Sequence, residues 1–174
     1  MFSYTQLQAE SKEWVAHNFK NRHPLEPVLG LFEEIGELHE HNDPPEEADA
    51  IADITIFAAD ACNGYGLNLG AIVKEASERS ALTQSIIVTM GKLAHHALKD
   101  KQDIRGTHEE HVTAIGEQLV CLFEHVHAWS RARGIVLLPL VETTWKKVVQ
   151  KRDWRPPVGH TTVDGPDPLR ASTR

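Results

Sequence analysis

The chain has 174 residues, a formal net charge of −7 at pH 7, and 41% hydrophobic and 25% charged residues. This size suits one well-cored domain or two small repeats, and the composition is that of an ordinary globular protein. The negative charge disfavours a general nucleic-acid binder. No apolar run has the length of a membrane span, and residues 1–6 do not resemble a signal peptide. Two cysteines, Cys62 and Cys121, make no disulfide framework. We therefore predict a cytosolic protein without membrane or nucleic-acid partners.

Helical periodicity dominates the sequence, and strand signals are nearly absent. A first long helix opens near Pro27, with these apolar residues at helical spacing: Leu29, Leu31, Phe32, Ile35 and Leu38. After the break at residues 42–45, Asp43 is expected to cap a second helix with Pro44 at its first position. Its buried side is expected to contain Ile51, Ile54, Phe57, Ala58, Ala61 and Cys62. Residues 63–66 should end this helix, and a further helix covers about Leu69 to Arg79.

The second half of the chain repeats this plan. Gly36-Glu37-Leu38 returns as Gly91-Lys92-Leu93 at an offset of 55, and Ala50-Ile51-Ala52-Asp53-Ile54 returns as Ala114-Ile115-Gly116-Glu117-Gln118 at an offset of 64. Thr107 and Glu110 form a capping box where Asp43 and Glu46 stand in the first copy. We predict an all-α helical bundle of two repeated helical-hairpin halves, an intramolecular pseudo-dimer. Residues 1–80 form the half with the acidic site, 81–155 a degenerate half, and 156–174 a mobile tail. The sequence leaves further homo-oligomerisation open.

Acidic residues are concentrated in one segment. From His23 to Val73 there are eleven acids and no Lys or Arg. A solvated acidic face is the simplest explanation, but the acids fall on two helical stripes. The first contains Glu33, Glu34 and Glu37, and the second contains Glu46, Asp49, Asp53 and Asp60. Two antiparallel helices joined by a short turn can bring these stripes face to face. An oxygen-only site of this kind suits Mg²⁺, with Mn²⁺ as the second candidate.

These residues carry a resemblance to a known family. Leu31-Phe32-Glu33-Glu34-Ile35-Gly36-Glu37-Leu38, followed by Asp49-Ala50-Ile51-Ala52-Asp53-Ile54, resembles the MazG-like all-α nucleoside triphosphate pyrophosphohydrolases, whose pattern is E-E-x-x-E, a spacer and E-x-x-D. The resemblance covers about Trp14 to Ala76 and returns, weakened, from Ser85 to Trp154. Its first motif is complete. In the second motif Ala50 replaces the glutamate, and Asp49 or Glu46 is a candidate substitute.

The resemblance implies Mg²⁺-dependent hydrolysis of a nucleoside triphosphate, NTP or dNTP, between its α- and β-phosphates. The products are a monophosphate and pyrophosphate. The expected metal ligands are Glu33, Glu34, Glu37, Asp49 and Asp53. Either Glu34 or Glu37 is the expected catalytic base for the attacking water, and the sequence does not choose between them.

Two further groups of residues are candidates for substrate binding. Lys147, Lys151 and Arg152 could grip the phosphates, although a solvated helix end favours lysines equally. Trp14 and Asn18, with Phe19, could form a base-stacking pocket, although such a tryptophan more often packs between helices. In the second half Val88, Thr89, Lys92 and Thr113 stand where the first half has acids. We therefore predict one working half and one scaffold half.

Two alternatives stay open at this point. The first is a non-catalytic helical module that senses nucleotides or binds a partner, which Ala50 and the eroded second half favour. The second is a di-iron site, because Glu124 and His127 form one E-x-x-H unit. A second copy of that unit is missing.

Overall fold

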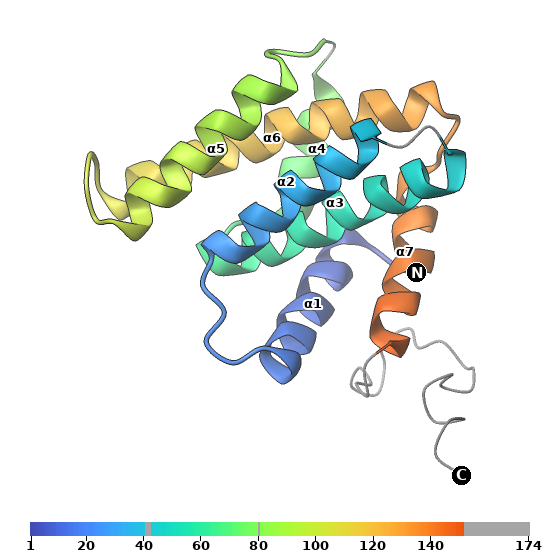
Figure 1. The fold of residues 1–174 in the computed structure, drawn as a ribbon, viewed down its shortest axis with the longest axis horizontal. Coiled ribbons are helices and arrows are strands. Elements are labelled where there is room, and N and C mark those ends of the chain that lie inside the picture. Colours follow the sequence, from blue (N-terminus) through green and yellow to red (C-terminus); the bar gives the residue numbers. More distant parts are fainter. Residues whose placement is uncertain (41–42, 80, 152–174) are drawn as a thin grey trace.

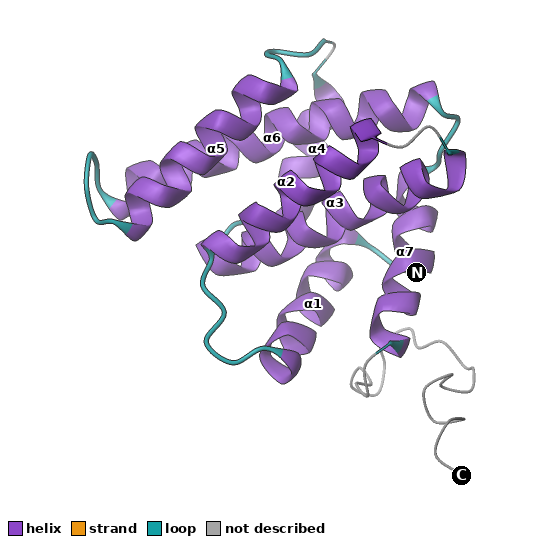
Figure 2. Cartoon of the chain, viewed as in Figure 1, coloured by secondary structure: helices purple, strands orange, loops and turns teal. Residues whose placement is uncertain are grey.

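The computed structural model describes residues 1–40, 43–79 and 81–151. These residues contain helices and no strand (Figures 1 and 2), which confirms the all-α prediction. The helices are α1 (Tyr4–Asn18), α2 (Leu25–Glu40), α3 (Pro44–Tyr65), α4 (Leu69–Glu78), α5 (Ile86–Lys101), α6 (His108–Ala132) and α7 (Leu137–Gln150). The predicted tail, residues 156–174, and Arg152 lie outside the described residues.

The helix ends largely follow the predicted caps. Asp43 occupies the N-cap of α3, although its side chain makes no capping hydrogen bond. Thr107 and Glu110 form the predicted capping box of α6. Helix α2 begins at Leu25 and not at Pro27, because the ring Nδ1 of His23 accepts a hydrogen bond from the Leu25 N–H and fixes the turn there.

Two antiparallel hairpins form the body of the molecule (Figure 1). Helix α2 packs along α3, α5 packs along α6, and the two hairpins meet through α2 and α5. Helix α4 follows α3 in the chain but packs against α6. Helix α7 follows α6 but packs against α3, next to α1. The chain therefore brings α1, α3 and α7 together, and this grouping positions the site described below.

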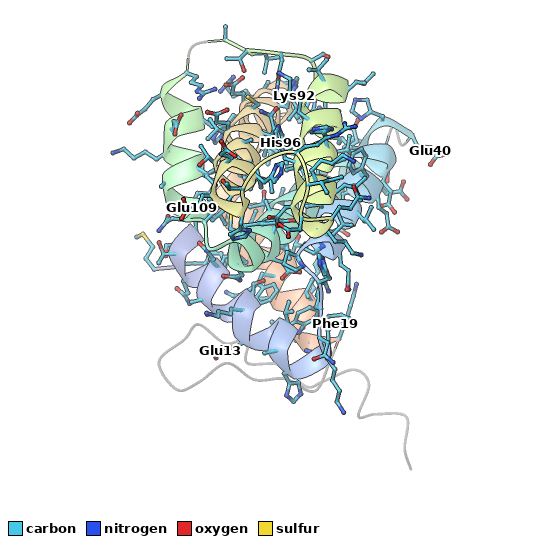
Figure 3. All side chains as sticks on the ribbon, turned by 90° about the vertical axis from the view of Figure 1, so that its left-hand side faces the viewer. Glu13, Phe19, Glu40, Lys92, His96 and Glu109 are labelled. Carbon is cyan, nitrogen blue, oxygen red and sulfur yellow. The ribbon has the colours of Figure 1, made fainter. Side chains whose placement is uncertain are left out.

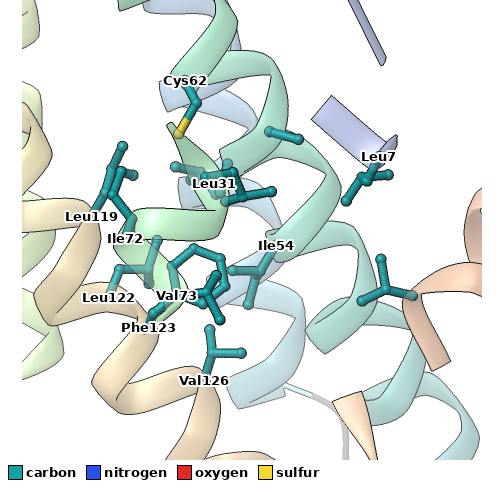
Figure 4. Close-up of a cluster of buried hydrophobic side chains, with 14 of the residues drawn as sticks. Leu7, Leu31, Ile54, Cys62, Ile72, Val73, Leu119, Leu122, Phe123 and Val126 are labelled. Carbon is teal, nitrogen blue, oxygen red and sulfur yellow. The ribbon is translucent and has the colours of Figure 1, made fainter. Parts of the chain in front are cut away.

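A continuous hydrophobic core joins both predicted halves. Figure 4 shows Leu31 and Ile54 from the first hairpin in the same cluster as Leu119 and Phe123 from α6, and all four are fully buried. The apolar periodicity of α2 did not identify its buried face correctly. Leu29 and Phe32 are 60% and 39% exposed, because the face of α2 that carries Val28 and Leu31 packs inward.

Two smaller predictions concern cysteines and membranes. Cys62 and Cys121 are both buried and free. No helix among the described residues is long and apolar enough to cross a membrane.

Candidate active site

The carboxylates of the predicted acidic stripes on α2 and α3 lie close enough to raise one another's pKa values. Glu34 is half-buried on α2. Its pKa is raised to about 8, mainly by burial and then by the neighbouring charges of Asp53, Glu37, Glu33 and Asp49, in that order. All five predicted metal ligands therefore belong to one electrostatic cluster, as the antiparallel hairpin required.

Asp53 is the second half-buried carboxylate of this cluster. Burial and the charge of Asp49 raise the pKa of Asp53 to about 6, while Lys151 and Lys147 on the α7 side act to lower it. The two lysines are exposed. The tertiary structure thus brings these predicted phosphate-binding residues to the acidic cluster from the far end of the chain.

The carboxylates of the cluster suit a hard divalent cation but do not form a preassembled metal cage. Their oxygens are the donors that Mg²⁺ and Mn²⁺ take. Among the described residues no three His, Cys, Asp or Glu side chains are gathered closely enough to hold a metal ion. Glu33, Glu37 and Asp49 are exposed at the rim, whereas Glu34 and Asp53 are half-buried.

The altered second motif favours Asp49 over Glu46 as the additional acid. Ala50 is buried in the core. Asp49 raises the pKa of both Glu34 and Asp53, and its Oδ1 accepts a hydrogen bond of 3.4 Å from Thr144 on α7.

An aromatic cavity of about 230 Å³ adjoins the cluster, between α1, α3 and α7. Glu34 and Asp53 line one side of it. The aromatic residues of its wall are Trp14, Phe19, Phe57 and Trp145. Trp14 makes edge-to-face contacts with Phe19 and Trp145, with ring centroids 5.5 and 5.8 Å apart. Stacked or edge-on aromatic walls of this kind suit a flat heterocycle.

The remaining predicted binding residue, Asn18, is not part of the cavity wall. Its side-chain amide donates a hydrogen bond of 2.9 Å to the backbone carbonyl of Trp14 and closes the end of α1. Figure 3 places Phe19 at this end of the molecule, far from Glu40 at the end of α2.

The sequence interpretation missed several residues of the cavity, among them Arg22, Phe57 and Trp145. Phe57 was predicted on the buried side of its helix; it is half-buried against the core, lines the cavity, and its ring leaves no room for a Cβ atom at Gly30. Trp145 reaches the cavity from α7 and donates its indole N–H to the buried Glu10 at 2.7 Å. Of these residues, only Arg22 could have been noticed in the sequence, because it is the last Lys or Arg before the acidic segment.

Most of the equivalent positions of the second hairpin contain neutral or basic side chains, whereas Glu117 and Glu124 stand in the places of Asp53 and Asp60. Thr89, in the place of Glu34, is buried and donates to the carbonyl of Ser85. Lys92, in the place of Glu37, donates to Gln84 at 2.8 Å. Glu124, from the E-x-x-H unit, is held by Arg79 and Thr83.

In comparisons with family models, curated proteins and solved structures, nothing matches this chain.

Proposed function

We propose that this protein is a Mg²⁺-dependent nucleoside triphosphate pyrophosphohydrolase that converts an NTP or dNTP to its monophosphate and pyrophosphate. One observation carries the proposal: two half-buried carboxylates with raised pKa values, Glu34 and Asp53, lie between an aromatic cavity and two lysines. A nucleotide has the matching parts, since its base is flat and its triphosphate attracts both cations and lysines.

Mg²⁺ bound by Glu33, Glu34, Glu37, Asp49 and Asp53 would neutralise phosphate charge and polarise the α-phosphoryl group. Lys147 and Lys151 bind the phosphates from the α7 side. The water oxygen forms a bond to the α-phosphorus while the bond from that phosphorus to the bridging oxygen breaks. The pyrophosphate leaves with the bond's electron pair.

The carboxylate of Glu34 takes the proton of the attacking water, with Glu37 as the alternative base. Burial and the neighbouring carboxylates raise the pKa of Glu34 to about 8 in the metal-free protein, so this carboxylate has a higher proton affinity than an ordinary glutamate. The raised pKa is the physical reason to prefer Glu34 over Glu37.

We also propose that the chain is a fused pseudo-dimer in which only one site has kept its acids. Three features support this arrangement: the two hairpins pack together, α4 and α7 each pack on the opposite hairpin, and the glycines that follow α3 and α6 have nearly equal left-handed φ angles of 67° and 65°. The working site is then composite, since α7 from the second half supplies Trp145, Lys147 and Lys151.

The deciding experiment is a panel of NTPs and dNTPs with Mg²⁺, in which released pyrophosphate is measured. We expect turnover of at least one nucleotide, and loss of that turnover in Glu34→Gln and Glu37→Gln. Glu40→Gln is the matched control, because Glu40 is an exposed glutamate on the same helix far from the cavity. No turnover, or full turnover in both site variants, contradicts the proposal.

The second candidate is a nucleotide-sensing or partner-binding module without catalysis. Ala50 in the second motif and the absence of a preassembled metal cluster among the described residues favour it. Nucleotide-dependent thermal stabilisation without pyrophosphate release would identify this alternative.

A further inference from the structure

An ion pair between Arg22 and Asp60 forms part of the wall of the aromatic cavity. The Nε of Arg22 lies 2.9 Å from Oδ2 of Asp60, and their side chains are only 14% and 12% exposed. The guanidinium of Arg22 also lies over the ring of Phe19, 4.7 Å from its centroid. Both members of the pair line the same cavity as Trp14. The pair is therefore a second polar part of the wall, separate from the carboxylates of Glu34 and Asp53.

Arg22 and Asp60 form an ion pair, but part of their hydrogen-bonding capacity is unused within the described residues. Although Arg22 Nε is close to Asp60, the two are misaligned, and within the described part of the chain this buried nitrogen has no hydrogen-bond partner. None of the hydrogen bonds between described residues uses the carboxylate of Asp60. Guanidinium groups carry five N–H donors and carboxylates about four acceptor positions, and buried groups of this kind are normally satisfied. Unpaired donors and acceptors at a cavity wall indicate a site where a ligand forms the missing hydrogen bonds.

The equivalent pair in the second hairpin is saturated. Glu124, at the position equivalent to Asp60, accepts from Arg79 at 2.8 Å, from the Thr83 N–H at 2.7 Å and from the Thr83 hydroxyl at 3.0 Å. The other terminal nitrogen of Arg79 donates to Glu75 at 2.8 Å. In the second hairpin, other protein groups therefore complete the hydrogen bonds of the acid–arginine pair. In the first hairpin, some donors and acceptors of the pair have no such partner among the described residues.

The position of Asp60 along α3 fits a nucleotide. Asp60 follows Asp53 by seven residues, which is two helical turns or about 10.5 Å along the axis. Phosphates at Asp53 and Glu34 would leave the ribose and base to extend along α3, past Phe57. The far edge of the base then reaches Arg22 and Asp60.

Resting on the proposed function, we propose that Arg22 and Asp60 are the specificity-determining residues that recognise the hydrogen-bonding edge of the nucleobase. Arg22 only donates and Asp60 only accepts, so together they match an edge on which a carbonyl or ring nitrogen stands next to an N–H. Because the pair is neutral overall, it favours an uncharged heterocycle over a phosphate. A base with the wrong order of groups leaves a buried donor or acceptor unpaired.

The test measures kcat/KM for triphosphates of all the common bases, and in parallel the affinity for the corresponding monophosphates by calorimetry. We expect the wild type to rank the bases clearly. Asp60→Asn replaces acceptor capacity with a donor at nearly constant shape, so it should lower kcat/KM and affinity for the preferred base about tenfold to hundredfold and change the ranking. Arg22→Lys, which keeps the charge but loses the planar fork, should also change the ranking.

Glu124→Gln is the matched control, since it weakens the equivalent pair away from the cavity and should leave the base ranking as in the wild type. Circular dichroism checks that each variant is folded. An equal loss for every base in Asp60→Asn, or a wild type that treats all bases alike, overturns the inference. Ranked binding of monophosphates without pyrophosphate release instead overturns the proposed function and leaves the inference standing. If no nucleotide binds, both fail.

Discussion

The two helical hairpins of this protein have different side chains at the positions that the proposed repeat makes equivalent. In the α2–α3 hairpin, the carboxylates act on one another, Lys147 and Lys151 oppose their charge only in part, and burial raises the pKa of Glu34 and Asp53. In the α5–α6 hairpin, Thr89 and Lys92 replace Glu34 and Glu37 and donate hydrogen bonds within the protein. Under the proposed repeat, the polar groups left unsatisfied in one hairpin are the ones to examine for function, because the other hairpin packs without them.

The largest expected effect is on turnover. Asp53→Asn should reduce the Mg²⁺-dependent release of pyrophosphate by about a hundredfold to ten-thousandfold, since it removes a charge from the cluster that binds the cation and positions the water. Glu117→Gln changes the equivalent residue of α6, which is exposed, and should leave turnover unchanged. Steady-state rates of the two variants measure this difference, and equal losses would refute a single working site.

The second prediction compares the stability of the two acid–arginine pairs. Burial acts to raise the pKa of Glu124, but hydrogen bonds from the Thr83 backbone and from Arg79 outweigh it, so the pKa is lowered. For Asp60, burial outweighs Arg22 and the pKa is raised. Glu124→Ala should therefore lower the free energy of unfolding by about 2–4 kcal/mol, since it leaves buried partners unpaired.

Asp60→Ala should cost less, about 1–2 kcal/mol. It leaves Arg22 without its ion-pair partner, but the removed carboxylate accepts no hydrogen bond from the described residues, whereas Glu124 accepts several. Urea denaturation measures both variants. A larger loss in Asp60→Ala than in Glu124→Ala would show that the pair at the cavity is the structural one.

The third prediction uses two glycines of α2. Gly30→Ala places a Cβ atom against the ring of Phe57, so the ring must move toward the cavity. We expect a loss of about 1–3 kcal/mol in stability, together with weaker nucleotide binding. Gly36→Ala is the matched control, because nothing lies within 4 Å of its added Cβ. That variant should gain about 0.5–1 kcal/mol. Thermal unfolding with and without nucleotide measures both, and a stabilised Gly30→Ala would contradict the packing described above.

The smallest expected effect is the pH dependence of the free energy of unfolding of the metal-free protein. The pKa of Glu34 is about 8 in the folded chain, against an ordinary value of 4.5, so the folded state holds a proton that the unfolded state releases between these values. The free energy of unfolding should therefore fall as pH rises from about 4.5 to 8. Asp53 adds to the fall between 3.8 and about 6.

Glu34→Gln should flatten this dependence and stabilise the metal-free protein at neutral pH. Denaturation at a series of pH values with a chelator present measures the slope. Solvent screens a half-buried group, so the change is modest. An unchanged slope in Glu34→Gln would mean that Glu34 is not the strongly perturbed acid.

Local pattern was sufficient to predict the helical class, the main breaks and the acidic stripes. Pro44 and Gly66 bound α3 because proline and glycine restrict or free the backbone whatever surrounds them. The capping box of Thr107 and Glu110 depends only on residues three apart. Glu33, Glu34 and Glu37 share a flank because helical geometry fixes their spacing.

Other features depend on contacts that no local spacing encodes. Leu29 and Phe32 follow the helical apolar pattern but are exposed, since the position of α3 and α5 decides which face of α2 is buried. Trp145 and Lys147 reach Trp14 and Asp53 only because α7 packs on α3, more than ninety residues away in the chain. The sequence by itself determined the helices and their acids. Only tertiary packing decided which acids are buried, which arginine lines the cavity, and that α7 lies beside the acidic residues of α3.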